Sequence, residues 1–124
     1  MSTLKVGTVA DTSGGSGSTP AQILNGRTKA WGEFHGVNDT INASYGVSSI
    51  TDTGTGDYDV NFSTAMADAH YVAYGSVIGS PSGGYHSTLT SDGSSKEAGK
   101  CPFRTRHIND NSNELTSVQI AFIR

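Results

Sequence analysis

Apolar and polar residues alternate over most of the chain, as they do in strands that bury one face. From Lys29 the period is two, with one face carrying Ala30, Gly32 and Phe34 and the other carrying Trp31, Glu33 and His35. The same alternation predicts strands over residues 45–50, 57–62, 71–78, 85–90, 103–108 and 116–123. Clusters of Gly, Ser, Asn and Asp separate these segments, as is typical of turns. The pattern predicts an all-β fold, and we expect an antiparallel β-sandwich.

The N-terminal region has a different character. Residues 3–9 alternate and predict a short N-terminal strand, whereas the Gly- and Ser-rich residues 11–18 predict a flexible linker. Residues 19–22 have the form of a capping box with Pro20 at the first helical position, so residues 20–25 are expected to form one short helix that ends at Gly26. The expected organisation is an N-terminal strand and linker over residues 1–18, followed by the β-sandwich domain over residues 19–124.

The composition predicts a hydrophobic core with few aliphatic side chains. Leu, Ile, Val and Phe together make up 23 of 124 residues, while five Tyr, four Phe and one Trp supply large apolar groups. Few aliphatic side chains leave little burial energy to offset the entropy of ordering the backbone. Oligomerisation is one remedy, and the single Cys101 cannot form a disulfide within the chain. Composition therefore favours an oligomer.

Charge and hydropathy argue against nucleic acid and membrane as partners. The net charge is −3, and Arg104 and Arg106 are the only arginines that lie close together, which is too little for a nucleic-acid surface. No apolar run approaches the roughly 20 residues of a membrane helix, and no apolar signal region follows Met1. We expect no nucleic acid, no membrane insertion, and synthesis in a cytoplasm.

The segment TDTGTGDYDVNF, residues 51–62, has the composition of a ligand loop but the wrong spacing for one. A calcium loop that begins at Asp52 would place Gly54 and Gly56 at ligand positions, and a phosphate loop would lead into a helix rather than a strand. We expect a hairpin connection instead. Asp57 and Asp59 point to one face of a strand, which leaves a glycan depolymerase as an alternative, although a solvent-exposed strand face explains the same pattern.

Binding chemistry is expected in the second half of the chain. Residues 79–84 and 91–100 predict long loops without an apolar pattern, and loops on a rigid β scaffold commonly carry function. The candidate receptor-binding residues combine planar side chains with hydrogen-bond donors, and they are Tyr85, His86, Arg104, Arg106 and His107. The four His lack the spacing of a zinc site, the sequence indicates no cofactor, and ions on a threefold axis stay open. Trp31 offers a stacking face for a sugar, but packing in the fold or in an interface is the preferred interpretation.

Part of the sequence resembles a bacteriophage tail-fibre module that is common in phages of marine bacteria and cyanobacteria. The resemblance covers residue 2 to about residue 76 and rests on the pattern KAW, F-x-G, VSSITD-x-GTGDY-x-VNF and AM. Gly32, where the family favours a larger strand residue, and residues 37–44 depart from that pattern. The residues placed in the fold or interface are Trp31, Tyr58, Val60, Phe62, Met66 and Tyr71.

The resemblance implies a homotrimeric fibre-tip domain or adhesin, intertwined and without enzymatic activity. It would sit in the virion with other tail proteins and bind a receptor on the host cell, a surface glycan or a protein. Two alternatives stay open besides it. One is a structural fibre segment or virion decoration protein that binds no receptor, and the other is the small glycan depolymerase that uses Asp57 and Asp59.

Overall fold

In the described part of the chain, nearly all regular secondary structure is antiparallel β-strand, which confirms the all-β prediction. The computed structural model describes residues 2–10, 17–20, 23, 26–78, 96–106 and 114–124. Its strands are β1 (Val9–Ala10), β2 (Gly17–Ser18), β3 (Thr28–His35), β4 (Thr40–Tyr45), β5 (Val47–Gly54), β6 (Asp57–Phe62), β7 (Val72–Ile78), β8 (Lys100–Arg104) and β9 (Ser117–Ile123).

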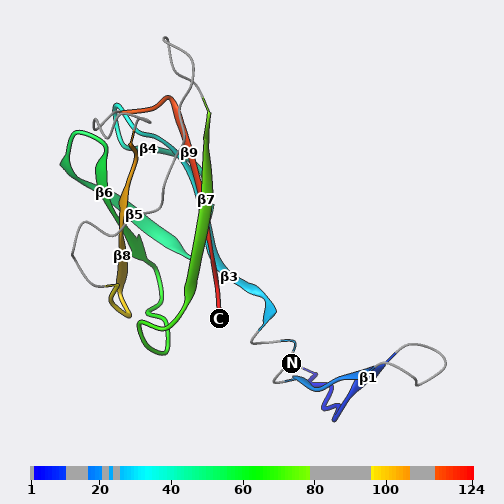
Figure 1. Ribbon diagram of the computed structural model, residues 1–124. Coiled ribbons are helices and arrows are strands. Elements are labelled where there is room, and N and C mark those ends of the chain that lie inside the picture. Colours follow the sequence, from blue (N-terminus) through cyan, green and yellow to red (C-terminus); the bar gives the residue numbers. More distant parts are fainter. Residues whose placement is uncertain (1, 11–16, 21–22, 24–25, 79–95, 107–113) are drawn as a thin grey trace.

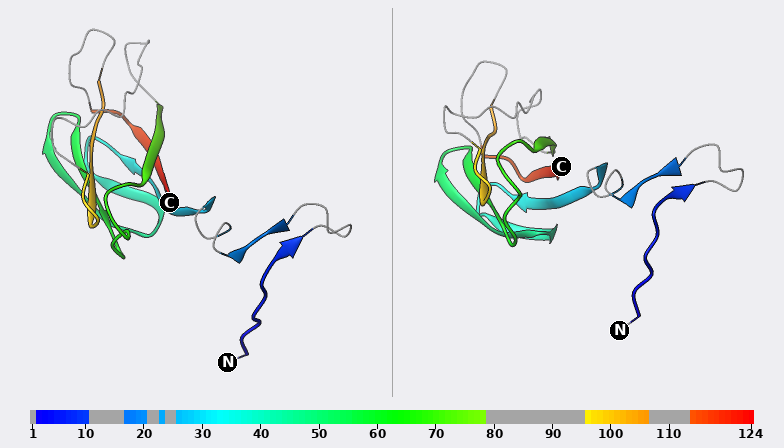
Figure 2. Two further views of the ribbon diagram at one scale, coloured as in Figure 1. Left: turned by 60° about the horizontal axis from the view of Figure 1, so that its bottom comes forward. Right: turned by 90° about the horizontal axis from the view of Figure 1, so that it is seen from below.

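The strands form two larger sheets and one small ribbon. The four-stranded sheet has the order β4-β3-β9-β7, and the three-stranded sheet has the order β5-β6-β8. Every pairing in them is antiparallel. The ribbon of β1 and β2 lies apart from both sheets in all three ribbon views (Figures 1 and 2). Buried residues of both larger sheets join in one hydrophobic cluster.

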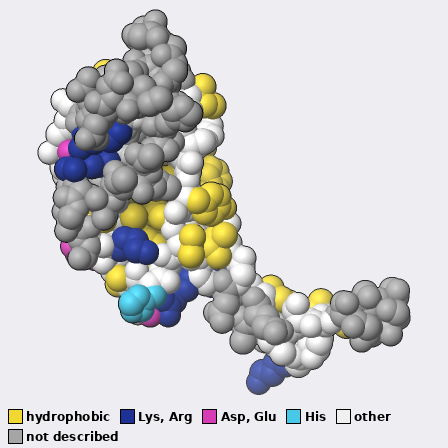
Figure 3. Space-filling view, in the orientation of Figure 1, with side chains coloured by type: hydrophobic (Ala, Val, Ile, Leu, Met, Phe, Trp, Pro, Cys, Tyr) yellow, Lys and Arg dark blue, Asp and Glu magenta, His cyan; other side chains and the backbone are white. Residues whose placement is uncertain are grey.

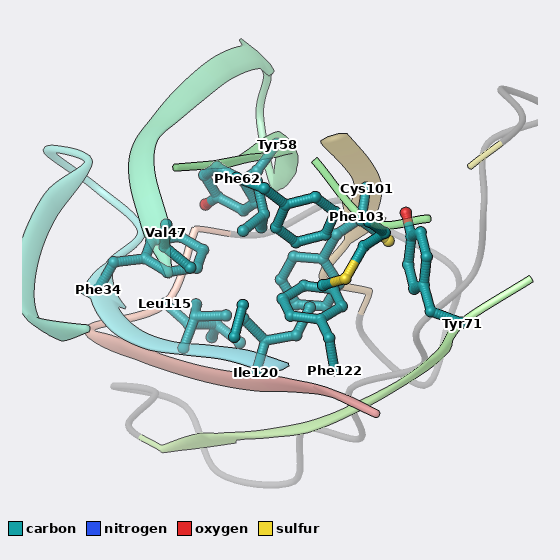
Figure 4. Packing of buried hydrophobic residues seen from close by; sticks show 14 residues of the cluster. Phe34, Val47, Tyr58, Phe62, Tyr71, Cys101, Phe103, Leu115, Ile120 and Phe122 are labelled. Carbon is teal, nitrogen blue, oxygen red and sulfur yellow. The ribbon is translucent and has the colours of Figure 1, made fainter. Parts of the chain in front are cut away.

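Aromatic side chains dominate that core, in two groups of three (Figure 4). In the first group the rings of Phe34 and Tyr58 meet edge to face with centroids 5.2 Å apart, and Phe103 packs against both. In the second group Phe62 and Phe122 meet edge to face at 4.8 Å, and Tyr71 packs against both. Both groups draw residues from the two sheets. Edge-to-face pairs stabilise by about 0.5–1.5 kcal/mol beyond their area burial, which partly compensates for the shortage of aliphatic side chains.

Local sequence explains the strands with one buried face. β6 places Tyr58, Val60 and Phe62 inward, and β9 places Val118, Ile120 and Phe122 inward, with half-buried residues between them. β3 turns Ala30, Gly32 and Phe34 toward the core, as the alternation predicts.

The TDTGTGDYDVNF segment is a hairpin between β5 and β6, as expected. The carboxylate of Asp52 accepts a hydrogen bond from the Gly54 amide at 2.8 Å, and Gly56 adopts a left-handed backbone with φ of 70°. Glycine adopts that conformation without the strain that a side chain brings. These glycines therefore turn the chain, and Tyr58, Val60 and Phe62 after them are buried in the hydrophobic core.

Tyr71, which directly precedes β7, fixes the segment 96–100 to the core. Its hydroxyl lies 2.9 Å from the carbonyl oxygen of Lys100 and 3.2 Å from that of Glu97. The Lys96 ammonium donates to the Tyr71 carbonyl at 2.6 Å and lies 4.9 Å from the centroid of the Tyr71 ring. One aromatic residue thus holds the segment through hydrogen bonds and a cation–π contact.

The sequence prediction was wrong about β4 and the strand after it. The predicted strand over residues 45–50 is in fact the end of β4 and the start of β5, separated by Gly46 with φ of 70°. β4 itself was missed because it pairs only with β3, at the edge of its sheet, and is exposed along most of its length. An edge strand of this kind has no alternating pattern to recognise.

The N-terminal prediction was also wrong in part. Only Val9–Ala10 forms a strand, and its partner is Gly17–Ser18, within the residues expected to be a linker. Leu4 is 86% exposed, so the alternation over residues 3–9 has no sheet to pack on. Pro20, Ile23 and Gly26 are helical, and the Ile23 amide donates to the Thr19 carbonyl at 3.1 Å, in agreement with the short helix.

Two further strand predictions concern the second half of the chain. The strand expected over residues 103–108 begins and ends earlier, as β8, and the strand expected over residues 85–90 lies outside the described residues. The predicted loop over residues 79–84 lies outside them too, and of the predicted loop over residues 91–100 only residues 96–100 are described.

Candidate binding surfaces

The structure describes two of the five residues predicted to bind a receptor. Tyr85, His86 and His107 lie outside the described residues. Arg104 is the last residue of β8, and Arg106 follows it by two positions. Alternation along an extended chain brings these two arginines to the same side.

Asp57 joins the two arginines. Nε of Arg104 lies 2.9 Å from Oδ1 of Asp57, and Nη2 of Arg106 lies 3.3 Å from the same oxygen. Asp57 and Arg104 face each other directly in the register of β6 and β8. The Arg106 side chain is only 15% exposed. The three groups tie the end of β8 to β6, and the predicted role of the arginines in receptor binding stays a prediction.

The second carboxylate of the depolymerase alternative is also held by a cation. Nζ of Lys100 donates to Oδ2 of Asp59 at 2.8 Å. This hydrogen bond and the charge of Asp59 raise the pKa of Lys100 above its ordinary value. Both carboxylates on β6 thus have a cationic partner from β8 or just after it. Cross-strand pairing explains why both lie on one face of the strand.

The outer face of the four-stranded sheet carries a row of exposed aromatic side chains. Trp31 of β3 is opposite Tyr45 of β4. On its other side Trp31 is opposite Ala121 of β9, which in turn is opposite Tyr74 of β7. We call Trp31, Tyr45 and Tyr74 the aromatic row, and these residues are 41%, 60% and 47% exposed. The other five residues placed in the fold or interface are buried, so Trp31 is the one that is not in the core of this chain.

A groove of about 410 Å³ lies over Ala121 in the middle of this row. Neighbouring strands are about 4.8 Å apart, so Trp31 and Tyr74, which are two strands apart, stand roughly 10 Å from each other. That gap is wide enough for one planar ring above Ala121. Hydrophobic side chains are visible along the β7 side of the molecule (Figure 3).

A polar row runs beside the aromatic row on the same face. Glu33, Gln119 and Ser76 are opposite one another in register. The Ser76 hydroxyl donates to Oε1 of Gln119 at 3.0 Å, and the Ser117 hydroxyl donates to Oε1 of Glu33 at 2.9 Å. These bonds orient the two longer side chains at the edge of the groove, where they offer an acceptor and an amide donor to a ligand.

Sequence reasoning predicted this surface only in part. It placed Trp31 and Glu33 together on the face away from Ala30 and Phe34, which the structure confirms. It did not predict that Tyr45 and Tyr74 join Trp31, because their meeting depends on the register of four strands. Exposed aromatic residues on predicted strands were the available signal.

Comparison of the chain with protein family models, curated proteins and solved structures finds no match. Among the described residues no helix is long and apolar enough to cross a membrane. In that same part of the chain, no three His, Cys, Asp or Glu residues are grouped so that they could hold a metal ion. Function must therefore be inferred from the chemistry of the surfaces.

Proposed function

We propose that the chain is the receptor-binding domain of a bacteriophage tail fibre, which adheres to a glycan on the surface of the host bacterium. The domain acts without catalysis, as a β-sandwich that assembles into an intertwined homotrimer within the virion. The resemblance of residues 2–76 to a tail-fibre module supports this proposal. Two antiparallel sheets around one core are the arrangement expected for a sandwich.

The observation that carries the proposal is the exposed aromatic row. A chain with few apolar residues exposes its only Trp and two of its five Tyr on one sheet face. These rings stay 41–60% exposed, so a partner that covers them gains apolar burial that the fold itself does not use. Exposed aromatic residues grouped on a surface mark interaction sites.

A glycan matches the chemistry of this surface. A sugar ring has an apolar C–H face that can stack on an indole or phenol ring, and hydroxyls at its edge that need donors and acceptors. The groove offers both, with rings from Trp31 and Tyr74 and oriented polar groups from Glu33 and Gln119. Sites of this kind combine an apolar surface with a few fixed polar groups.

Adhesion of the purified domain to bacterial cells tests the proposal. Fluorescently labelled wild type is compared with the variant Trp31→Ala plus Tyr74→Ala on a panel of marine bacteria and cyanobacteria. Ile78→Ala is the matched control, because Ile78 is exposed on β7 and does not line the groove. Wild type and control should bind cells of the host, and the double variant should lose most of that binding. Purified surface glycan should compete.

Light scattering on the same samples separates a receptor surface from a subunit contact. We expect wild type and the double variant to have the mass of a trimer. A double variant that falls apart into monomers would show that the aromatic row joins subunits, which contradicts its role in adhesion. Absence of wild-type binding to every strain in the panel would favour a structural fibre segment or decoration protein.

A further inference from the structure

A second hollow, which we call the basic pocket, adjoins the aromatic row at Tyr45. It has a volume of about 430 Å³ and is lined by residues 64–67 together with Arg27, Lys29, Tyr45, Gly46 and Arg124. Three of these lining residues are cationic and none is acidic. The whole protein has a net charge of −3, so this concentration of positive charge runs against its overall balance. Figure 3 shows Lys and Arg side chains at the lower end of the domain.

Backbone contacts build the pocket from segments far apart in the sequence. Gly46 has φ of 70°, and a Cβ at this position would lie 2.8 Å from the carbonyl oxygen of Lys29. Only glycine allows the chain to pass so close to β3 at this point. The Ser63 amide donates to the Gly46 carbonyl at 2.9 Å, and the Met66 amide donates to the Ala98 carbonyl at 2.7 Å. The residues that line the pocket after β6 are thus fixed at both ends of the Ser63–Met66 turn.

An acidic residue beside the pocket holds one of its cations in place. Oδ1 of Asp68 accepts a hydrogen bond from the His70 amide at 2.7 Å and also binds Nη1 of Arg124. The His70 amide first, and then Arg124, hold the pKa of Asp68 below its ordinary value. A guanidinium has five N–H donors, so the contact with Asp68 leaves Arg124 able to donate to a ligand. Asp68 therefore acts as a positioning residue for Arg124.

We propose that the basic pocket binds the anionic group of an acidic saccharide, a sugar carboxylate or sugar phosphate, while the sugar ring stacks on Tyr45. This inference rests on the proposed function and names the class of its receptor. Three cations line the pocket, and Asp68, which pairs with Arg124, is the carboxylate described beside it. This excess of positive charge favours an anion, and Arg matches the geometry of carboxylate and phosphate oxygens. The volume suits one sugar unit, since small-ligand sites span about 300–1,000 Å³.

The position of Tyr45 links the pocket to the adhesive surface. Tyr45 lies at one end of the aromatic row, opposite Trp31, and also lines the pocket. A glycan chain that stacks along the row therefore reaches the cations at the end of the same sheet where β3 begins and β9 ends. The receptor that fits both surfaces is a glycan with acidic sugars at intervals, and a neutral glycan would leave the basic pocket unused.

Titration of the full chain by NMR tests the inference without knowledge of the host. The probes are glucuronate, a glucose monophosphate, glucose and inorganic phosphate, each at millimolar concentration. We expect the acidic sugars to shift the amide signals of Gly46, Ala65 and Ala67, and glucose to bind at least about tenfold more weakly because it lacks the charge-assisted hydrogen bonds. Binding of only one acidic sugar identifies which anion the pocket prefers and also supports the inference.

Two variants and a control assign the binding to the pocket. Arg27→Gln should lower the affinity for the acidic sugar by about tenfold, and Arg27→Gln plus Lys29→Gln should lower that affinity further. Arg27 is exposed, so the single variant should keep the fold even if the double variant does not. Lys5→Gln removes the same charge from an exposed position outside the pocket and should leave binding unchanged.

Several results would overturn the inference. They are equal shifts with glucose, inorganic phosphate that binds as tightly as the glucose monophosphate, no shift with either acidic sugar, and an Arg27→Gln variant that binds like wild type. Adhesion to cells can persist in each of these cases, and then the proposed function stands while the basic pocket is not its acidic subsite. Binding of acidic sugars by a domain that adheres to no cells would instead support the pocket and refute the adhesin.

Discussion

Two glycines in one row of the four-stranded sheet should respond in opposite ways to an added methyl group. Gly32 of β3 and Gly75 of β7 both lie opposite Ile120 of β9, one on each side. A Cβ on Gly75 would lie 2.2 Å from the backbone oxygen of Gln119, which no side-chain rotation can relieve. A Cβ on Gly32 would meet Val47 at 3.7 Å, an ordinary van der Waals contact. Gly75→Ala should destabilise the domain, and Gly32→Ala should not.

The expected magnitudes follow from these contacts. β7 must move away from β9 to admit the Gly75→Ala methyl, and overpacking of this kind costs about 1–3 kcal/mol. Replacing Gly by Ala also restricts the unfolded chain, which stabilises the protein by about 0.4–1 kcal/mol where the new methyl fits. For Gly32→Ala only the second effect operates. The effect on the unfolded chain is common to both variants and cancels, so their free energies of unfolding should differ by the overpacking cost, about 1–3 kcal/mol.

Chemical denaturation of both variants and wild type measures this difference. Each kcal/mol corresponds to about 3–5 °C in Tm for a domain of this size, so thermal melts should place the two variants roughly 3–15 °C apart. Gly32 is also the position where the tail-fibre module favours a larger strand residue, and Gly32→Ala moves the chain toward that pattern. Equal stability of the two variants would refute the register of β7 against β9 from which the clash is derived.

Three further predictions concern the core. Tyr58→Phe removes the buried hydrogen bond from the Tyr58 hydroxyl to the Gly36 carbonyl, which is 3.0 Å long. Urea denaturation should show a free energy of unfolding lower by about 1–2 kcal/mol, and no change would mean that water replaces the hydroxyl. Burial raises the pKa of Tyr58 and of Tyr71, so both stay protonated in the fold after the unfolded chain ionises near pH 10. Stability should hold below that pH and fall above it, by up to about 1.4 kcal/mol per pH unit for each phenol, and denaturation midpoints that stay constant to pH 11 would contradict this. Cys101 is a buried free thiol whose pKa is raised by burial, so an aromatic disulfide reagent should label it only as fast as the domain opens, and immediate labelling of the native protein would contradict the described packing.

Strands with one buried face could be predicted from the sequence, because burial itself imposes the alternation. β6 and β9 show this most clearly, and β3 even allows the outer face to be assigned. β4 could not be predicted in this way, since hydrogen bonds to β3 hold it while its side chains remain mostly in water. The same holds for β1 and β2, where backbone pairing joins short exposed segments.

The candidate sites were less predictable than the fold, because they depend on register. Alternation shows that Trp31 faces away from Phe34, but it does not show which residues of other strands stand beside it. The basic pocket depends on even longer separations, since Arg27 and Arg124 are 97 positions apart in the sequence. The sequence shows neither that these cations meet nor that Gly46 lets the chain approach β3 closely enough to form the wall.

The anchoring of residues 96–100 by Tyr71 has a consequence for how such a protein evolves. Residues 79–95 join two fixed points, because β7 ends at Ile78 and Lys96 is bonded to Tyr71. Doubling the length of a connection between fixed points costs only about 0.6 kcal/mol in closure entropy. New sequences can therefore be inserted or exchanged between these anchors while the aromatic core keeps its packing. For the proposed tail-fibre domain, this connection is the place where sequence can follow changes in the receptor while the scaffold is kept.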